Sequence, residues 1–308
     1  MRLFIAIQLP DEMKKALVAC MHDLKKQGVE GNYVPAQNLH LTLAFIGEYD
    51  DPAGVKRVLE SVPLPPFRLS LSEKGNFGNL LWAGVKGNQK LKTYVKDLRE
   101  ALKEADIPVI NLDVRADEQN LADAFIGSDD ENAGKVCAQN LTERKPDGGK
   151  MVLVENPQNA AINARITGFE EAVRNKGFEV VKRIDAGSTE SGVQAEMAAA
   201  LAEDPQIDAV MCGDDRMALQ VLQALNDAGR NDILVYSVGG SPEVKSALAD
   251  PESPMAGIGA QSPINIGKTA VKTAEALLDG GAYEKEISVE TFFINRDNLE
   301  MYGTDGWQ

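Results

Sequence analysis

The chain has 308 residues, with 32 Lys and Arg against 47 Asp and Glu, a formal net charge of −15, and 44 % hydrophobic residues. This length allows two domains, and the composition excludes a disordered or collagen-like chain. The excess of acid disfavours general binding to nucleic acid or to an acidic membrane, because like charges repel.

The acidic side chains are unevenly distributed along the chain. Residues 1–105 hold 15 basic and 12 acidic side chains, a net charge of +3, whereas residues 106–308 hold 17 and 35, a net charge of −18. A step of this size indicates separate modules. We therefore predict two domains that meet at residue 105.

The first module mixes helices with strands that are neighbours in sequence. Its opening run of about five apolar residues is shorter than the roughly 7–15 of a secretory signal and predicts a buried strand. The order β-α-β-α-β-β-α is typical of an α+β lobe with helices on one face. The predicted strands are residues 3–9, 39–45, 67–71 and 80–85, and the predicted helices begin after Pro10 and cover 53–62 and 91–105.

Alternation along the predicted strand 39–45 places His40 and Thr42 on one face and three leucines on the other. A histidine that titrates near neutral pH can shuttle a proton, and a threonine hydroxyl can bind a phosphate oxygen. An ordinary strand with a solvent-facing histidine explains the same pattern. Spacing alone leaves both interpretations open.

Four segments together carry a resemblance to a known family: residues 2–10, residues 38–48, a turn at Gly75-Asn76-Phe77, and residues 81–85. They resemble the two-histidine phosphoesterases, which include RNA 2′,3′-cyclic phosphodiesterases and 2′-5′ RNA ligases. In that family two lobes each supply one His-x-Thr motif. The resemblance implies His40 as a catalytic acid or base, Thr42 as a donor to a phosphate oxygen, and an RNA 2′,3′-cyclic phosphate end as a partner.

The second histidine motif of that family has no counterpart in this sequence. No histidine follows His40, and the only other one, His22, lies on the first predicted helix. Loss of one acid or base typically lowers a rate on the order of 10²–10⁴-fold. We therefore expect phosphodiesterase activity to be weak or absent, and the sequence leaves open whether the chain is an enzyme.

The second module alternates short apolar strands with helices, which predicts parallel sheets joined by right-handed crossovers and hence a doubly wound α/β fold. The predicted strands are residues 109–112, 124–126, 151–154, 178–183, 209–212, 233–237 and 256–260. The predicted helices are residues 133–142, 162–176, 192–202, 215–228, 242–250 and 264–279.

Polar side chains follow these strands, among them Asp113, Asp130 and Asp214. In a parallel sheet the carboxyl ends meet at one edge, where carboxylates and amides can bind the neighbouring hydroxyls of a sugar. Each of these residues can instead cap a helix. For Asp214 and Asp215 we expect both roles, with one acid capping and the other facing a ligand.

Five segments of this module resemble the type I periplasmic sugar-binding proteins of bacterial ABC transporters: residues 107–113, 127–134, 163–169, 212–219 and 259–263. The resemblance implies that Asp113, Arg165, Asp214 and Gln261 bind a sugar, although Arg165 can instead be structural. Many relatives carry an Asp where this chain has Gly239, which leaves the identity of the sugar open.

The resemblance also implies one intact lobe at about residues 129–261 and a partial lobe at 107–128 plus 262–289, without the family's first β-α units. Relatives are exported, but the sequence as written shows no export signal and no run of ~18 apolar residues, so we expect a cytoplasmic protein without a membrane span. Three cysteines far apart in sequence indicate no zinc site or disulfide framework, and we expect no metal and no cofactor. The oligomeric state stays open.

Three functional hypotheses follow. In the first, a periplasmic-binding-protein-like module within a probable chimera binds a sugar or polyol. In the second, residues 1–105 retain weak cyclic phosphodiesterase activity. In the third, the chain is an inert chimera with neither function. We favour the first as the functional reading.

Overall fold

The computed structural model describes residues 2–29, 33–77, 80–115, 119–187 and 192–307. The chain forms two compact units. Unit 1 contains residues 1–111, 115–125 and 270–286, and unit 2 contains residues 112–114, 126–269 and 287–308. Both units therefore include residues from the second predicted module, and the division at residue 105 stays a prediction from sequence.

Unit 1 begins with an antiparallel strand pair, β1 and β2, in which Gln8 lies opposite His40 and Ala6 lies opposite Thr42. A small apolar core includes Ile5 and Ile46 from these strands and Leu98 and Leu102 from a helix. The elements in this part of the chain are β1 (Arg2–Gln8), α1 (Asp11–Lys26), β2 (His40–Glu48), α2 (Pro52–Ser61), β3 (Leu71–Phe77), β4 (Leu80–Val85) and α3 (Gln89–Glu104).

The predicted strand at residues 67–71 is wrong, because β3 begins only at Leu71, opposite Val85 of β4. Three prolines at positions 63, 65 and 66 precede this segment, and proline cannot donate a ladder hydrogen bond. The predicted turn at residues 75–77 is also wrong, since these residues belong to strand β3 and pair with residues of β4. Residues 78 and 79, which follow, lie outside the described part of the chain.

Unit 2 is built on a six-stranded sheet with the order β13-β11-β10-β9-β7-β8. Strands β7 to β11 are parallel, and β13 runs antiparallel to β11. The strands of this sheet are β7 (Gly149–Glu155), β8 (Phe178–Asp185), β9 (Ile207–Cys212), β10 (Leu234–Gly239), β11 (Met255–Ala260) and β13 (Phe292–Ile294). A separate three-stranded sheet has the order β12-β6-β5, with β5 (Ile110–Leu112), β6 (Ala124–Ser128) and β12 (Glu286–Val289).

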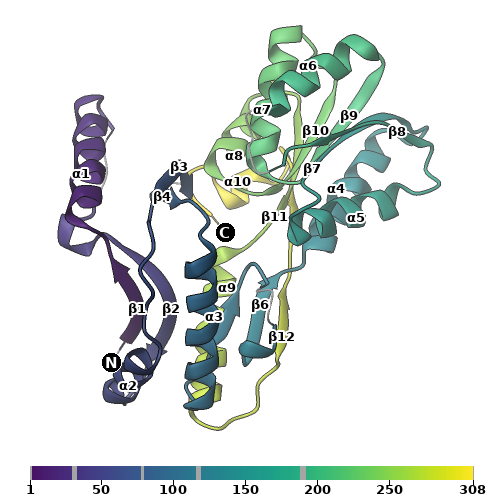
Figure 1. Cartoon of the computed structure of the whole chain (residues 1–308). Coiled ribbons are helices and arrows are strands. Elements are labelled where there is room, and N and C mark those ends of the chain that lie inside the picture. Colours follow the sequence, from purple (N-terminus) through teal and green to yellow (C-terminus); the bar gives the residue numbers. More distant parts are fainter. Residues whose placement is uncertain (1, 30–32, 78–79, 116–118, 188–191, 308) are drawn as a thin grey trace. The chain divides into compact units, whose positions relative to one another are not determined.

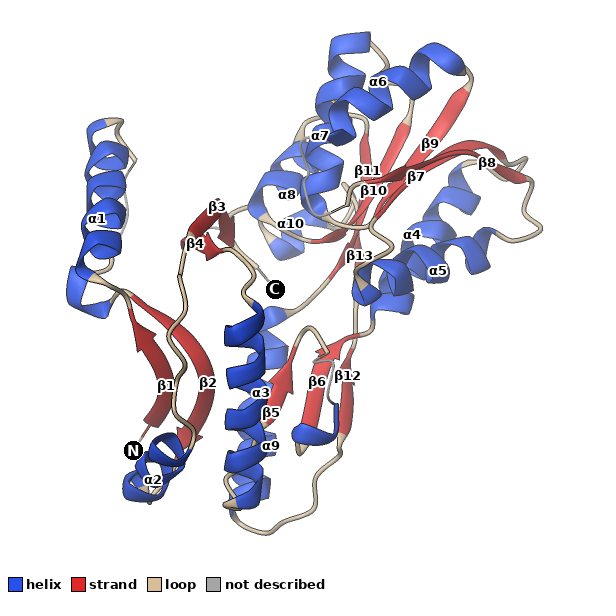
Figure 2. Cartoon of the chain, viewed as in Figure 1, coloured by secondary structure: helices blue, strands red, loops and turns tan. Residues whose placement is uncertain are grey.

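Helices cover both faces of the six-stranded sheet (Figures 1 and 2). Helices α4 and α5 pack together, and α6, α7 and α8 pack in series. This arrangement confirms the predicted doubly wound α/β fold. The helices of unit 2 are α4 (Asp130–Arg144), α5 (Ala160–Val173), α6 (Val193–Glu203), α7 (Asp215–Ala228), α8 (Pro242–Ala249) and α10 (Leu299–Tyr302). Helix α9 (Pro263–Leu278) is divided between the two units, which separate after residue 269.

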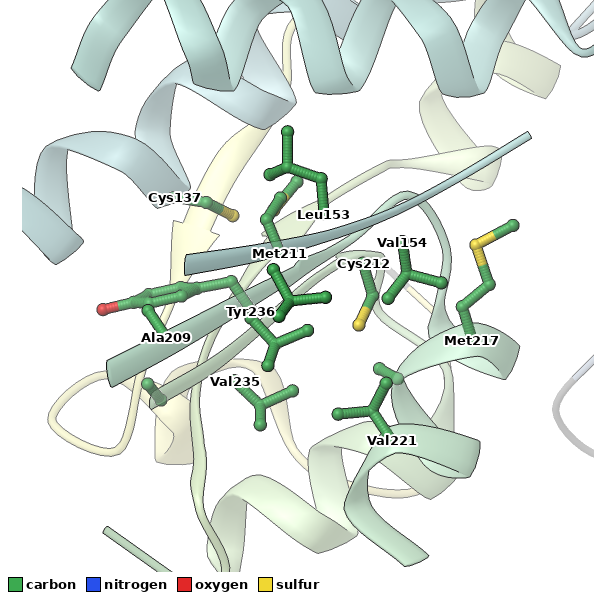
Figure 3. Close-up of a cluster of buried hydrophobic side chains, with 14 of the residues drawn as sticks. Cys137, Leu153, Val154, Ala209, Met211, Cys212, Met217, Val221, Val235 and Tyr236 are labelled. Atoms are coloured by element: carbon green, nitrogen blue, oxygen red, sulfur yellow. The ribbon is translucent and has the colours of Figure 1, made fainter. Parts of the chain in front are cut away.

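The core of unit 2 consists of apolar side chains from the central strands and the helices against them. Figure 3 shows Met211 and Cys212 of β9 among this cluster, with Val221 of α7 nearby. Tyr236 is fully buried, and its hydroxyl donates to the Asn140 side-chain oxygen at 2.9 Å. The buried polar group therefore has a partner, as a close-packed core requires.

Helices α4 and α5 approach each other closely because two glycines face the crossing. A Cβ atom on Gly134 would lie 1.8 Å from the Arg165 carbonyl oxygen, and one on Gly168 would lie 2.1 Å from the Glu131 carbonyl oxygen. Only glycine permits this backbone contact. The crossing brings the first residue of α4, Asp130, next to the Arg165 side chain of α5.

Candidate functional site

The carboxyl ends of β9, β10 and β11 lie at one edge of the six-stranded sheet, because these strands are adjacent and parallel. The chain goes from β7 outward to β8 and then returns to β9 on the other side of β7. Ligands of open α/β sheets bind outside the carboxyl ends at such a reversal. We refer to this place, with its residues Asp130, Arg165, Asp214 and Gln261, as the ligand edge.

Arg165 and Asp130 form an ion pair at this edge. The Arg165 Nε donates to Asp130 Oδ1 at 2.8 Å, and a terminal nitrogen of the same guanidinium donates to the Gly213 carbonyl oxygen at 2.9 Å. The two side chains are only 11 % and 17 % exposed. Burial raises the pKa of Asp130, and the charge of Arg165 opposes this shift. Arg165 therefore ties α5 to α4 and to the segment after β9, which is the structural role that the sequence left open for it.

Gln261 joins the same pair. Its side-chain amide donates to Asp130 Oδ1 at 3.3 Å, and its backbone N–H donates to the Gly239 carbonyl oxygen at 2.8 Å. Asp130 thus brings together two predicted site residues, Arg165 and Gln261, from distant parts of the sequence. The charge of Asp113, an exposed residue with a φ of 65°, also acts on Asp130 and raises its pKa.

Asp130 was not predicted as a site residue. The sequence signal for it was its place in the polar run Ser128-Asp129-Asp130 after a strand. In the structure Asp129 caps α4, since its Oδ1 accepts from the Asn132 N–H at 3.0 Å. Because Asp129 is the capping residue, Asp130 is available to pair with Arg165. The sequence alone does not show which of two adjacent acids has which role.

Asp214 and Asp215 have different roles. Asp214 caps α7, accepting from the Met217 N–H at 2.8 Å, and its other oxygen accepts from Arg216 at 3.2 Å. Asp215 points into the protein, where its carboxylate accepts from the Ser237 hydroxyl at 2.9 Å. Asp214, predicted to bind a sugar, is therefore the capping acid, and its neighbour Asp215 is buried. Binding of a sugar by Asp214 stays a prediction.

His40 and Thr42 lie on β2, which belongs to unit 1, whereas the residues of the ligand edge belong to unit 2. His40 is exposed, and its ring stacks on Phe4 with centroids 5.0 Å apart. Its Nδ1 lies 2.6 Å from the Asn38 carbonyl oxygen. A carbonyl oxygen only accepts, so Nδ1 carries the proton and the Nε2 lone pair is available as a base.

Two absences hold for the described residues. They contain no cluster of three or more His, Cys, Asp or Glu side chains arranged to hold a metal ion. None of the described helices combines the length and the hydropathy that crossing a membrane requires.

Comparisons with known proteins match two different segments of the chain. Residues 92–282 match the family described as "Periplasmic binding protein domain", and residues 7–86 match the family described as "LigT like Phosphoesterase". These matches confirm the composite resemblance predicted from the sequence. The first match begins before the predicted boundary at residue 105, within α3.

Individual proteins agree with both matches. The ribose import binding protein of Escherichia coli K12 is 30 % identical over 188 residues, which cover 61 % of this chain and 62 % of that protein. The chain thus spans less than two thirds of the length of this relative. The RNA 2′,3′-cyclic phosphodiesterase of Methanocaldococcus jannaschii is 29 % identical over 133 residues, which cover 41 % of this chain and 70 % of that protein.

A solved structure shares the fold of the second segment. It is the periplasmic binding protein component of the arabinose ABC transporter from Shewanella sp. ANA-3, bound to α- and β-L-arabinofuranose. It is 25 % identical, with a TM-score of 0.60, and the match covers 67 % of this chain and 71 % of that chain.

Proposed function

Since residues 92–282 make this chain a member of the periplasmic binding protein domain family, we propose that it binds a small sugar or polyol at the ligand edge of unit 2. The observation that carries the proposal is the half-buried, hydrogen-bonded group formed by Asp130, Arg165 and Gln261. It holds hydrogen-bonding side chains from three elements at the carboxyl ends of parallel strands, where α/β folds bind ligands.

The chemistry of the edge suits neighbouring hydroxyl groups. A carboxylate oxygen accepts, and an amide such as Gln261 both donates and accepts, so that together they can pair with a diol. Asp130 and Asp214, together with Asp113 whose charge acts on Asp130, give the edge more negative than positive charge once Arg165 is paired. An uncharged sugar is therefore favoured over a sugar phosphate or a sugar acid.

The proposal is tested by isothermal titration calorimetry of the full chain with D-ribose, D-allose, L-arabinose and myo-inositol. We expect at least one of these to bind with a Kd in the micromolar to millimolar range. The variant Gln261→Ala should weaken binding on the order of tenfold, the size of one lost hydrogen bond. Gln206→Ala is the matched control, because Gln206 is exposed at the amino end of β9 and should leave binding unchanged. Absence of binding by all four ligands to a folded sample rejects the proposal.

A second candidate function is hydrolysis of an RNA 2′,3′-cyclic phosphate at His40 and Thr42. It is supported by the match of residues 7–86 and by the available Nε2 of an exposed histidine. We expect this activity to be weak, since the second His-x-Thr motif is missing from the sequence.

Hydrolysis of 2′,3′-cyclic AMP tests this second function. His40→Ala should abolish any turnover, whereas His22→Ala, the matched control on α1, should not change it. Equal turnover by the two variants would rule out His40 as the catalytic group. A folded, monodisperse chain that fails both the calorimetric and the hydrolytic assay would instead support an inert fusion of two family segments.

A further inference from the structure

One buried carboxylate accepts hydrogen bonds from the turn at the end of β10. Asp215, the first residue of α7, accepts from the backbone N–H of Gly240 at 2.8 Å and of Ser241 at 2.7 Å. It also accepts from the Ser237 hydroxyl at 2.9 Å. The carboxylate therefore has three protein donors and no need of a ligand.

The turn and the carboxylate fit each other closely. Gly239 has a φ of +149°, and a Cβ atom built on it would lie 2.5 Å from Asp215 Oδ2. A side chain at position 239 would thus both strain the backbone and displace the carboxylate. At positions 239 and 240 the turn therefore presents only backbone groups.

The same turn is hydrogen-bonded to Gln261, a residue of the ligand edge. The Gly239 carbonyl oxygen accepts from the Gln261 N–H at 2.8 Å, and the Gln261 side chain reaches Asp130. A series of hydrogen bonds therefore runs from Asp215 through the turn to Gln261. Movement of the turn would shift Gln261 relative to Asp130.

Burial of Asp215 shifts the pH at which its carboxylate gains a proton. Burial raises the pKa of Asp215 to about 6, and the hydrogen bonds from Ser241, Ser237 and Gly240 oppose the shift. The other titratable groups on which its charge acts are the thiols of Cys137 and Cys212 and the Lys245 amine.

Burial shifts the pKa of each of these neighbours as well. Burial raises the pKa of both thiols, so they remain neutral at physiological pH. Burial lowers the pKa of Lys245, whose amine donates to the Gly306 carbonyl oxygen and also faces Asp305.

We propose that Asp215 is a positioning residue, which holds the turn of residues 239–241 and with it Gln261, and that protonation of this carboxylate in mildly acidic solution loosens the turn. The part that concerns the ligand rests on the proposed function, whereas the part that concerns the turn does not. On protonation, Ser237 rotates to accept the new O–H, and the two N–H bonds lose their charge assistance. Hydrogen bonds to a charged acceptor are roughly twice as strong as neutral ones.

Nuclear magnetic resonance of the full chain without ligand tests the turn directly. The backbone amide resonances of Gly240 and Ser241 should titrate together between pH 4.5 and 7.5, with a common midpoint near 6. Asp215→Asn keeps the shape of the side chain without its charge, and should make both resonances independent of pH. Asp227→Asn, at an exposed position on the same helix, should leave the titration intact. Flat resonances in the parent chain, or a titration that persists in Asp215→Asn, overturn the proposal.

Calorimetry at pH 5 and pH 7.5 with D-ribose, D-allose, L-arabinose and myo-inositol then tests the effect on the ligand edge. We expect the ligand that binds to do so less tightly at pH 5, on the order of tenfold at most, and Asp215→Asn to remove this pH dependence. Equal affinity at the two pH values would refute the link to Gln261. Failure of all four ligands to bind at either pH would count against the proposed function and the ligand part alone, because the amide titration decides the turn without any ligand.

Discussion

Helix α7 of unit 2 and helix α1 of unit 1 have similar lengths but very different surroundings. The apolar residues of α7 pack against strands β9 and β10, and six of its residues are buried, including Met217 and Val221. Helix α1 also carries a line of apolar residues, yet none of its residues is buried. Most of the stability of a helix in a protein comes from packing of its apolar face. The two helices therefore differ in how much of their apolar side is packed against the rest of the protein.

The largest effect should come from removing a ring in the core of unit 2. Phe169 of α5 is fully buried, so Phe169→Ala should lower the free energy of unfolding by about 3–5 kcal/mol. Urea denaturation followed by circular dichroism measures the change. A loss of less than 1 kcal/mol would mean that unit 2 is no better packed than unit 1.

Asp215 should make the stability of unit 2 depend on pH. Its folded pKa of about 6 lies above the ordinary value of 3.8, so between these pH values the folded chain binds more protons than the unfolded chain. This contribution to the free energy of unfolding is therefore highest in acid and falls by about 3 kcal/mol as the pH rises through 6. The difference in unfolding free energy between the parent chain and Asp215→Asn, measured from pH 4 to pH 7.5, isolates it from other groups. A difference that rises with pH would reverse the sign and refute the assignment.

The contact of α4 with α5 should be intolerant of one added methyl group. Gly134→Ala places a Cβ against the Arg165 carbonyl oxygen and should cost about 1–3 kcal/mol. Gly267→Ala is the matched control, because this glycine of α9 has no atom near its Cβ position and alanine favours a helix. Thermal unfolding measures the melting temperatures of the two variants. Equal melting temperatures would show that α4 and α5 can move apart without a loss of stability.

The smallest effect should come from α1. Leu17 lies on the apolar side of this helix and is only half-buried, so Leu17→Ala should change the free energy of unfolding by less than about 1 kcal/mol. The same urea titration measures it. A loss comparable to that of Phe169→Ala would show that α1 has a packing partner in solution.

The alternation of strands and helices in residues 106–308 was predictable, because the period of the apolar residues is a local property of the sequence. The start of β3 at Leu71 was not, since it depends on pairing with Val85 across the hairpin. The short strands β12 and β13 were also missed, because three or four residues carry too little periodicity to identify a strand. Local pattern thus predicted the layers of unit 2 but not the partners of isolated strands.

The candidate site was predictable only in part for the same reason. The position of Gln261 after a strand indicated the correct edge of the sheet, and the structure places it there. The role of Asp130 depends on Arg165, which is 35 positions away and meets it only through the helix crossing. The different hydrogen-bond partners of Asp214 and Asp215 depend on the first turn of α7 and on β10, and two adjacent acids in a sequence do not reveal them.

Strand β13 has a consequence for how the protein is made. It pairs with the outer side of β11, and a Cβ on Gly257 of β11 would lie 2.1 Å from the Phe293 ring of the neighbouring strand. On the ribosome, β11 emerges well before residues 292–294. During that interval the nascent sheet exposes an unpaired edge, and an open edge is a template for pairing with another chain. Slow synthesis between β11 and β13 would therefore favour aggregation of nascent chains through the edge of β11, which β13 occupies in the finished sheet.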